Sequence, residues 1–595
     1  MKHLHVNPKL LTLFLLFLVL LPSCNNEEIF IVEESAIIAE ETEPTAEDTP
    51  NNEDVAPPID AVDDTVITMQ NVPVDIAAYL NDTNLPQSIT LSNTNPSNGV
   101  LTINNNDTPD NFIDDTVVYT PNAGFSGNDS FDYTICDATN PENCDTATVT
   151  ITINPIEDDF ATQLKAFPSA EGYGKNATGG RGGTVIKVTN LNADGAGSFK
   201  AACEASGTRI VVFEVGGRIN LTNTINITNP NITIAGQTAS GDGITISMEG
   251  TPNKPLMVIA TNDVILRYIT FRRSLAKVSE SNSDGIYIAE GNNIIIDHCS
   301  ISWASDENIA IADYSKNGTA NITVQNSIIA NAYGGSSKGS LNGGGVDKIT
   351  YFRNAFISNS IRNPQFACNS GDCAISDTNI EVINNVVYDY KFAVTHYVSD
   401  AGAGSINGNY IKNIGIMPSG RSVSRRFIYM STAEAIGIYT EGNIDQKRPT
   451  DNLDNWESTQ GTGGQGEIDV LGNLSYKATS PFSTQIVNDG ITLYNAVDIW
   501  SNIKSHVGAS YPTRDSFDAL LVSDIENLTE STDALANTSF PTITNGTALT
   551  DIDNDGMPDS WENTKFGNLT KDGKGDTDGD GYTDLEEFLN LVEID

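Results

Sequence analysis

The chain has 595 residues, with 78 Asp or Glu against 32 Lys or Arg, so its formal net charge is −46. This length is enough for three or more domains. The acidity argues against a nucleic-acid partner, because phosphate binding requires a basic face. It does not exclude a polyanionic substrate, since the local potential in a cleft can oppose the overall charge. A solubilising or salt-tolerant surface accounts for most of the acidity.

Residues 1–23 have the pattern of an export signal. Lys2 and Lys9 form a basic n-region. The apolar run 10–21 that follows is too short to span a bilayer as a helix. The next residues, Leu-Pro-Ser-Cys, resemble a bacterial lipobox in which Cys24 becomes the lipid-modified first residue. The acidic residues after it resemble the surface-export signals of Bacteroidetes lipoproteins.

The lipobox predicts a lipoprotein of the cell surface or outer membrane, which contacts the membrane through its lipid anchor alone. Cleavage by an ordinary signal peptidase would instead give a secreted protein. Residues 24–58 are rich in Glu, Pro, Asn and Thr without periodicity, which predicts a disordered tether.

Residues 59–155 contain short segments in which apolar and polar residues alternate between turn residues, as in a β-sandwich. The run 118–134 resembles the bacterial immunoglobulin-like or cadherin-like repeats of secreted proteins. No aromatic platform for sugar binding is visible in this module. We therefore expect it to be a spacer.

Six cysteines follow the lipobox. Cys203 and Cys299 lie in apolar segments and are expected to be buried thiols. Exported proteins can oxidise their cysteines, and the remaining four are close enough in sequence to form two tentative pairs, although sequence alone does not decide the pairing. These pairs are Cys136–Cys144 and Cys368–Cys373.

Within residues 160–545, short β-rich segments recur about 27 to 32 residues apart. Such a period without a helical stripe is typical of a solenoid, and Asn residues at matching places suit a ladder inside a turn. We predict a mainly β protein built on a right-handed parallel β-helix. A β-propeller is the alternative, but the tight hairpin turns that it needs are not evident. The segments begin at Ile232, Val264, Ile294, Ile322, Ile349 and Ile380.

Residues 546–595 contain two copies of the EF-hand loop spacing, with acidic residues at positions one, three, five and nine, Gly at six and Glu at twelve. Two copies favour calcium binding over an acidic disordered tail. The loops resemble dockerin-like or thrombospondin-type repeats, and we expect a structural role. The predicted ligands are Asp551, Asp553, Asp555, Asp559, Glu562, Asp576, Asp578, Asp580, Asp584 and Glu587.

Between residues 282 and 364, carboxylates are followed by isolated cations on short β-type segments. Hard oxygen ligands suit calcium. Removing a proton beside a carboxylate requires a cation to hold the developing charge and a base to take the proton. The pattern indicates a calcium-dependent lyase acting on an acidic sugar polymer. The residues concerned are Asn282, Asp284, Asp306, Glu307, Lys338 and Arg362.

Several motifs together resemble the pectate lyases of polysaccharide lyase family 1. The resemblance implies a parallel β-helix, Ca²⁺ as cofactor, and β-elimination of pectate, an acidic plant-type or algal polysaccharide, to unsaturated oligogalacturonides. We expect a monomer. The motifs are Ala-Phe-Pro-Ser-Ala-Glu-Gly-Tyr-Gly at 166–174, Thr-Gly-Gly-Arg-Gly-Gly at 178–183, Ile-Ile-Asp-His-Cys at 295–299, Ser-Trp-Ala-Ser-Asp-Glu at 302–307, Lys-Gly-Ser-Leu at 338–341 and Arg-Asn-Pro at 362–364.

By position, the resemblance makes Asp284 and Asp306 calcium ligands. Glu307 is a less certain ligand, because alternation along a strand would turn it away from Asp306. Asn282 replaces an Asp that the family often has, and Ala310 falls where the family has a second carboxylate. These differences predict weaker calcium binding in the absence of substrate.

The same resemblance makes Lys338 and Arg362 substrate-binding and catalytic residues. Arginine has a reference pKa above about 12, so it acts as a base only where other cations disfavour its charge. Lysine shifts its pKa more readily, and the sequence leaves the choice of base open. Arg272 and Arg273 both follow a predicted strand, and Arg272 is taken as the third candidate for the substrate groove. Ala367 stands where a second substrate arginine is expected.

Other motif residues are expected to be structural. Asp297 and His298 are expected to support a strand through a polar network, Trp303 to pack against neighbours, and Arg181 to tie down the N-terminal end of the solenoid. Two rival functions remain. A glycoside hydrolase needs a pair of acid and base carboxylates, and the polygalacturonase motifs are not found. A non-catalytic surface adhesin would use the solenoid and the calcium loops for stiffness.

Overall fold

The chain forms two compact units, Met1–Ile156 and Glu157–Asp595. The predicted signal and tether up to residue 56, the lipidation site Cys24 and the predicted partner Cys373 lie outside the described residues. The computed structural model describes residues 57–69, 73–105, 115–122, 125–154, 164–250, 253–275, 282–314, 318–333, 337–368, 378–391, 394–399, 406–422, 427–432, 436–446, 450, 468–470, 478–530 and 539–592.

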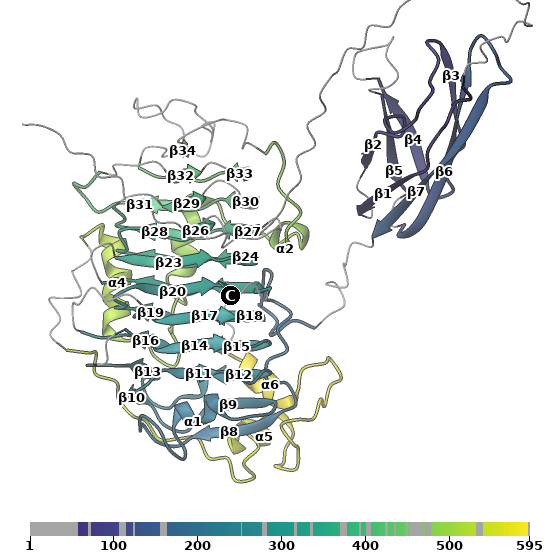
Figure 1. Cartoon of the computed structure of the whole chain (residues 1–595). Helices are drawn as coiled ribbons and strands as arrows, with labels where there is room; N and C mark the ends of the chain where they lie inside the picture. The colour runs from purple at the N-terminus through teal and green to yellow at the C-terminus, as the bar shows by residue number, and fades with distance from the viewer. Residues whose placement is uncertain are drawn as a thin grey trace, which may run out of the picture. The chain divides into compact units, whose positions relative to one another are not determined.

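The first unit is the expected β-sandwich, with one sheet in the order β1-β7-β6-β3 and the other in the order β2-β5-β4 (Figure 1). Alternating residues of β6 point into the core, where Phe131, Tyr133 and Ile135 are buried. A disulfide joins Cys136 to Cys144, as predicted. The strands are β1 Asp64–Met69, β2 Val74–Ile76, β3 Ile89–Asn93, β4 Gly99–Asn104, β5 Thr116–Pro121, β6 Gly127–Asp137 and β7 Cys144–Asn154.

The second unit is a right-handed parallel β-helix, in which each coil adds one strand to each of three parallel sheets. Sheet 1 comprises β8 Thr184–Val188, β9 Arg209–Phe213, β12 Ile232–Ala235, β15 Val264–Arg267, β18 Asn292–Asp297, β21 Ala320–Gln325, β24 Asp347–Phe352, β27 Thr378–Ile383, β30 Ile406–Ile411 and β33 Ile436–Glu441. Sheet 2 comprises β10 Gly217–Asn220, β13 Ile244–Ser247, β16 Thr270–Arg272, β19 Ser300–Ser302, β22 Ile328–Ala330, β25 Ala355–Ile357, β28 Val386–Tyr388 and β31 Ile414–Ile416. Sheet 3 comprises β11 Ile225–Ile227, β14 Met257–Ala260, β17 Ile286–Glu290, β20 Glu307–Ala312, β23 Lys338–Gly343, β26 Gln365–Cys368, β29 Thr395–Ser399, β32 Ile428–Thr432 and β34 Ile468–Val470.

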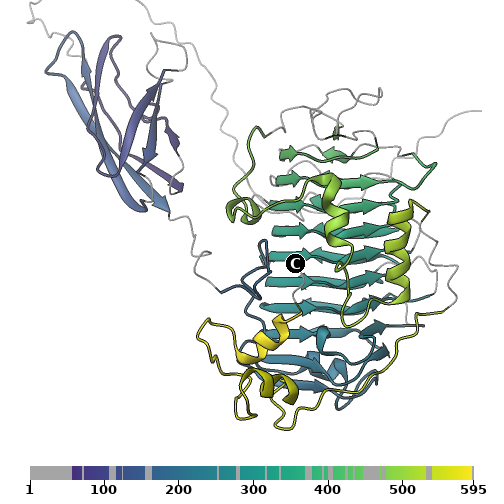
Figure 2. The same ribbon diagram turned by 180° about the vertical axis from the view of Figure 1, so that it is seen from behind.

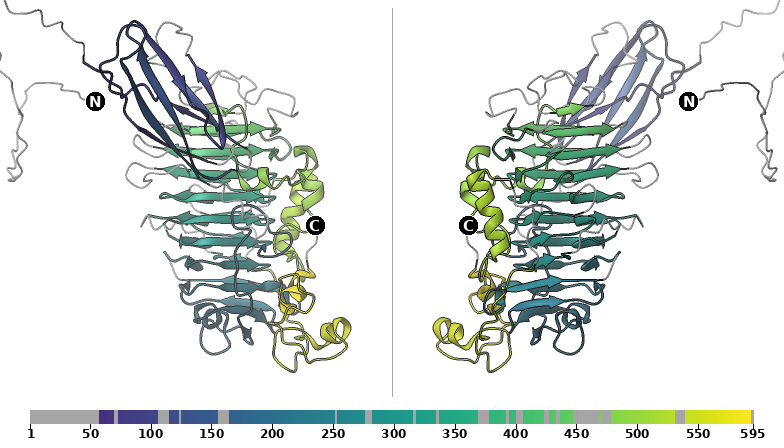
Figure 3. Two further views of the ribbon diagram at one scale, coloured as in Figure 1. Left: turned by 90° about the vertical axis from the view of Figure 1, so that its right-hand side faces the viewer. Right: turned by 90° about the vertical axis from the view of Figure 1, so that its left-hand side faces the viewer.

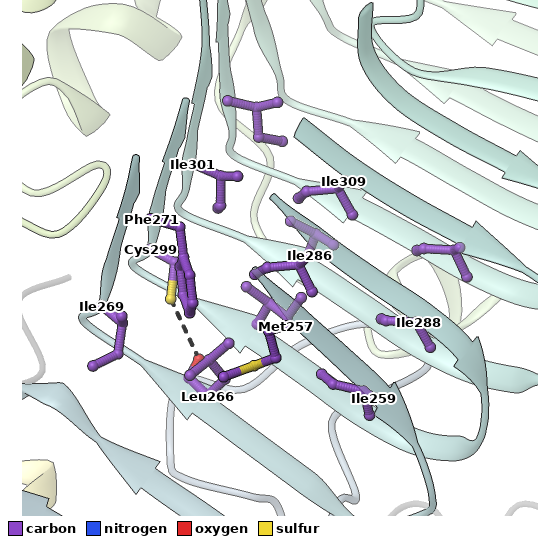
Figure 4. Packing of buried hydrophobic residues seen from close by; sticks show 14 of the residues in the cluster. Met257, Ile259, Leu266, Ile269, Phe271, Ile286, Ile288, Cys299, Ile301 and Ile309 are labelled. Carbon is purple, nitrogen blue, oxygen red and sulfur yellow. Dashed lines mark hydrogen bonds between the residues drawn. The ribbon is translucent and has the colours of Figure 1, made fainter. Parts of the chain in front are cut away.

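The predicted segments become consecutive strands of sheet 1, and their first residues lie in register. Ile232 pairs with Val264, which pairs with Ile294, and Ile322 continues the column to Ile349. These side chains are fully buried and belong to the large core inside the coils, part of which is shown in Figure 4. Each such burial stabilises the fold by about 1.5–3 kcal/mol. The solenoid prediction is therefore confirmed, and the propeller alternative is wrong.

The expected Asn ladder occupies the turn between sheets 1 and 2. The side-chain amide of Asn354 donates to Asn385 Oδ1 at 3.0 Å, Asn385 donates to Asn413 at 3.0 Å, and Asn413 donates to Asn443 at 2.8 Å. All four side chains are buried. Each coil thus satisfies the polar groups of its neighbour's turn, where an unpaired amide would cost about 1–3 kcal/mol.

The C-terminal helices lie on the outside of the coils along one side (Figures 2 and 3). Phe517, Leu521 and Ile525 of α4 follow a four-residue spacing and pack on outward-facing residues of sheet 2, including Ile328 and Ile357. Among the described residues, no helix is long and apolar enough to cross a membrane. The helices are α1 Phe199–Glu204, α2 Gln485–Asn488, α3 Ile499–Ile503, α4 Ser516–Asn527, α5 Asp559–Lys565 and α6 Asp584–Asn590, with 3₁₀ turns at η3 Gly236–Thr238 and η5 Ala496–Asp498.

The predicted calcium loops pack on the β-helix rather than forming a separate body. Met557, Leu585 and Leu589 are buried against Ile210 and Val212 of β9. In Figure 1 the yellow segment with α5 and α6 lies beside the first, blue coils. The end of the chain therefore returns to the beginning of the solenoid.

Candidate active site

The predicted catalytic residues gather where the chain enters sheet 3 in successive coils. Asp284 lies just before β17, Glu307 begins β20 and Lys338 begins β23. Glu307 pairs with Lys338 across the two strands, and Lys338 pairs with Ile361, the residue before Arg362. Parallel stacking therefore brings together side chains that are up to 78 residues apart in the sequence (362 − 284).

Three carboxylates converge at this position. Asp284, Asp306 and Glu307 each present an oxygen within 4.8 Å of the others. The Glu307 N–H donates to Asp284 Oδ1 at 3.0 Å, and the Asn282 N–H donates to Asp306 Oδ2 at 2.8 Å. These backbone contacts hold two of the three carboxylates in place.

Two cations face the carboxylates. Lys338 Nζ contacts Asp306 Oδ1 and lies 3.4 Å from Glu307 Oε1. The Arg362 guanidinium contacts the same Glu307 oxygen. Arg362 has φ = 66°, a left-handed conformation that costs a non-glycine residue about 1–2 kcal/mol. Asp284, Asp306, Glu307, Lys338 and Arg362 thus form one cluster, which the exposed Asn282 contacts through its backbone N–H.

Glu307 is a full member of this cluster. The alternation argument separated it from Asp306, but β20 begins only at Glu307, so Asp306 lies outside the pleat. Ala310 is a buried residue within the same strand. The second carboxylate beside Asp306 is therefore supplied by Glu307.

Burial and neighbouring charges shift the pKa values of Asp284 and Arg362. Burial first, and then the charge on Asp306, raise the pKa of Asp284 to about 7. Burial lowers the pKa of the Arg362 guanidinium, while the charges on Asp306 and Asp284 oppose that shift. Burial thus disfavours the charged form of both groups, and such shifts are common at functional sites.

The oxygen donors suit a calcium ion. Three converging carboxylates are the hard ligands that calcium prefers, and their combined charge exceeds that of Lys338 and Arg362. The donor set therefore fits Ca²⁺, and Asp284, Asp306 and Glu307 are the residues that would hold it.

Comparison with known proteins identifies the family. A probable pectate lyase C of Aspergillus flavus is 34% identical over 440 residues, which cover 73% of this chain and 95% of that protein. The chain belongs to the pectate lyase family. A second probable pectate lyase C, from Emericella nidulans, is 37% identical over 415 residues, which cover 68% of this chain and 87% of that protein.

A bacterial Ig domain model matches residues 52–152, in agreement with the sandwich of the first unit. Among solved structures, the cedar pollen allergen Jun a 1 matches with a TM-score of 0.39 at 16% identity, over 57% of this chain and 92% of that chain. Because this TM-score is below 0.5, membership of the pectate lyase family rests on the sequence relatives.

The structure corrects the prediction for Arg272. This side chain is fully buried between sheet 2 and α4, where it pairs with Asp515 and with Asp518 Oδ1 at 3.0 Å. It also donates to Ser302 Oγ at 2.7 Å. Arg272 is therefore a structural residue and does not face a substrate groove.

The neighbouring Arg273 was not predicted as a site residue of this pectate lyase. Its Nε donates to the Lys254 carbonyl at 2.9 Å, and its charge acts on Asp284 by lowering that carboxyl's pKa against the effect of burial. Phe271 points into the core. The Arg273 guanidinium also donates to the Met248 carbonyl, so backbone carbonyls hold it while its charge acts on Asp284.

The motif residues expected to be structural are buried. The buried Asp297 accepts from Arg267 Nε and from Gln325 Nε2, each at 2.9 Å, and lies 2.9 Å from His298 Nδ1. Trp303 is fully buried and packs against the Phe517 ring at 5.0 Å between centroids. Cys203 and Cys299 are buried free thiols, as expected.

The two C-terminal loops each bring three carboxylates within 4.8 Å: Asp551, Asp553 and Asp555 in the first, and Asp576, Asp578 and Asp580 in the second. Asp559 and Asp584 begin α5 and α6. The loops differ at position twelve. Glu587 pairs with Lys565 at 2.5 Å, whereas Glu562 is fully buried.

A cavity of about 430 Å³ lies away from the carboxylate cluster. It opens between the first coils and the C-terminal segment and is lined by Val212, Phe213, Tyr511 and Leu589, among others. The lining includes Lys187 and Asp551, but none of Asp284, Asp306, Glu307, Lys338 and Arg362. The catalytic chemistry is therefore assigned to the cluster and not to this cavity.

Proposed function

We propose that this member of the pectate lyase family is calcium-dependent and cleaves pectate by β-elimination to unsaturated oligogalacturonides. The observation that carries the proposal is the convergence of Asp284, Asp306 and Glu307 with Lys338 and Arg362 at the start of sheet 3. The relatives named pectate lyases support the substrate class.

Asp284, Asp306 and Glu307 would hold a calcium ion, whose positive charge would make the C5 proton of a bound uronate more acidic. Lys338 holds the carboxylate of that uronate through its ammonium group. Arg362 takes the C5 proton in its neutral guanidine form, which burial favours by lowering the pKa, and becomes the guanidinium. The electron pair of the C5–H bond then forms the C4=C5 double bond, the bond from C4 to the glycosidic oxygen breaks, and that oxygen takes a proton from water.

The experiment that tests this proposal incubates the full chain with polygalacturonate, with and without a chelator. Only a lyase creates a double bond, so ultraviolet absorbance should rise, stop on chelation, and return with added Ca²⁺. New reducing ends without absorbance would indicate a hydrolase. An unchanged polymer in the presence of calcium would indicate a binding protein or adhesin.

We also propose that the chain is a lipoprotein of the cell surface or outer membrane. The basic start, the apolar run and Cys24 support this location. Labelling with a fatty acid in the native host should mark the wild-type protein and not Cys24→Ala. Equal release of both proteins into the medium would indicate cleavage by an ordinary signal peptidase. We expect a monomer, which sedimentation of the full chain would check.

A further inference from the structure

The first C-terminal loop contains a buried carboxylate that the surrounding protein leaves unsatisfied. Glu562 is 0% exposed, yet neither of its side-chain oxygens has a hydrogen-bond partner among the described residues. Isolated burial of an ionised carboxylate is strongly unfavourable. The charges of Asp555, Asp553, Asp551 and Asp559 all act on it, and Lys187, paired with Asp551, offsets only part of this negative charge.

The second loop lacks this feature. Asp576, Asp578 and Asp580 converge equally closely but are all exposed. Glu587, at the position that matches Glu562, pairs with Lys565 at 2.5 Å. Converging exposed carboxylates are common without a bound ion, so the second loop by itself carries no assignment.

We propose that residues 551–562 bind one Ca²⁺, with Glu562 as the ligand that closes the site, and that this ion fastens the end of the chain onto the first coils of the β-helix. Asp551, Asp553 and Asp555 already present oxygens within 4.8 Å of one another. In loops of this spacing the residue at position twelve contributes both carboxylate oxygens. A divalent cation accounts for the unpartnered Glu562 and for the charge around it. The proposal is independent of the active-site calcium, because these residues take no part in the cluster on sheet 3.

The same loop supplies an apolar contact to the first coils. Met557, between Asp555 and Asp559 in the sequence, is fully buried against the outward-facing Ile210 and Val212. Without the C-terminal segment these apolar residues of β9 would face water. Holding the loop closed therefore holds the cover of β9 in place.

Polar contacts extend the attachment on both sides of the loop. Lys187 of β8 lies 3.0 Å from Asp551 Oδ2 and donates to Asn554 Oδ1 at 2.9 Å. Arg181 Nε donates to Glu586 at 2.9 Å, and the Tyr268 hydroxyl donates to the Val592 carbonyl at 3.1 Å. Arg181 thus ties the N-terminal end of the solenoid to the C-terminal segment.

Binding of an ion to the folded loop stabilises the closed loop and the strands that it covers. The equilibrium constant for local opening falls by the factor 1 + [L]/Kd, where [L] is the free calcium concentration. At a free calcium concentration of about 100 times Kd, local opening should become about 100-fold rarer. The affected amides should be those of β8 and β9, residues 184–213. Strands of the later coils should respond less.

The test measures hydrogen exchange and calcium stoichiometry on the full chain. Glu562→Gln should bind one Ca²⁺ fewer than wild type by isothermal titration calorimetry and should lose most of the calcium-dependent protection of residues 184–213. Glu526→Gln, an exposed glutamate of α4 that pairs with Lys504, is the matched control and should keep both. Unchanged stoichiometry in Glu562→Gln would overturn the site. Exchange of residues 184–213 that is insensitive to calcium in wild type would overturn the fastening role.

Asp284→Asn separates this proposal from the proposed function, because it removes a ligand of the active-site cluster alone. The variant should lose lyase turnover and retain the calcium-dependent protection of residues 184–213. If Glu562→Gln does not fold, the calcium titration of Asp284→Asn still decides the question. Loss of the protection in Asp284→Asn would assign the effect to the active site and overturn the proposal.

Discussion

Arg362 contacts the Glu307 carboxylate from a backbone conformation that few non-glycine residues adopt. We predict that Arg362→Ala lowers kcat by about 10²–10³-fold, the usual effect of removing a preorganised group that acts on developing charge. The ultraviolet absorbance of the product measures this change. The melting temperature should remain within a few degrees of the wild-type value.

Lys504→Ala is the control for that substitution, because it removes an exposed cation whose ion pair with Glu526 contributes little. It should leave turnover unchanged. Arg362→Lys should retain part of the activity and shift the pH profile of kcat toward lower pH, since a lysine has the lower pKa. Near-normal turnover in Arg362→Ala would contradict the role assigned to this residue.

The pKa shifts of two buried groups, His506 and Asp297, predict how the free energy of unfolding depends on pH. Burial lowers the pKa of His506 from 6.5 to about 4, so between these values the unfolded chain binds a proton that the folded chain does not. Stability should therefore fall as the pH drops from 6.5 to 4. Against the effect of burial, the charges of His298 and Arg267 hold the pKa of Asp297 well below its ordinary 3.8, so its contribution is present above 3.8 and is lost below it.

Urea unfolding at a series of pH values checks both windows. His506→Gln should flatten the slope between pH 6.5 and 4 and leave the steeper loss at lower pH. Asp297→Asn should lower stability at neutral pH, because Arg267 loses its carboxylate partner, and should flatten the slope below pH 3.8. Identical pH dependence of His506→Gln and wild type would contradict the assignment.

At the residue scale, the sequence predicted the cluster well because Asp306, Glu307, Lys338 and Arg362 each belong to a motif, and Asp284 matches a ligand of the family by position. Glu307 was the uncertain member, since the alternation rule needs the first residue of the strand and the sequence does not mark it. The prediction that Arg272 lies in the substrate groove was wrong for a different reason. The pattern indicated that Arg272 and Arg273 both follow a strand, but it did not show that α4 would cover one of them.

At the scale of elements, Arg272 links sheet 2 to the N-terminus of α4. We predict that Arg272→Met destabilises the second unit by about 3–5 kcal/mol, because it leaves Asp515 and Asp518 buried without a cation. Denaturant unfolding measures the loss. KM for pectate should not change.

The control for Arg272→Met replaces all three charged residues of the buried ion pair network. The triple variant Arg272→Met, Asp515→Asn, Asp518→Leu should recover most of the lost stability, since buried ion groups can often be exchanged for apolar ones at little cost. Asn at 515 retains an oxygen for the amides of Phe517 and Asp518, which the present residue caps. A raised KM in Arg272→Met would revive its substrate-binding role.

Strands and helices differed in how well they could be predicted. The strands of sheet 1 pair with the next coil about 30 residues on, so their apolar column and Asn ladder appear as a short period in the sequence. The partners of α4 lie up to 246 residues before it, as in the contact from Arg272 to Asp518. Such distant packing leaves no periodic signal.

At the scale of the whole molecule, the two units have separate cores. We predict that a chain beginning at residue 157 retains pectate turnover within about twofold, because each domain carries its own core. Calorimetry of the full chain should show two transitions. Reducing the Cys136–Cys144 disulfide should lower only the transition that the shortened chain lacks. Loss of activity on truncation would contradict the spacer role of the first unit.

The contact between Arg181 and Glu586 joins positions 405 residues apart, although neighbouring coils touch across only about 30. A β-helix can form one coil at a time as the polypeptide emerges during synthesis, because each coil contacts only its neighbours. Its first coils, however, remain incompletely covered until residues 557–589 have been synthesised. A nascent chain that has not reached these residues would therefore expose Ile210 and Val212 and be open to proteases and to self-association.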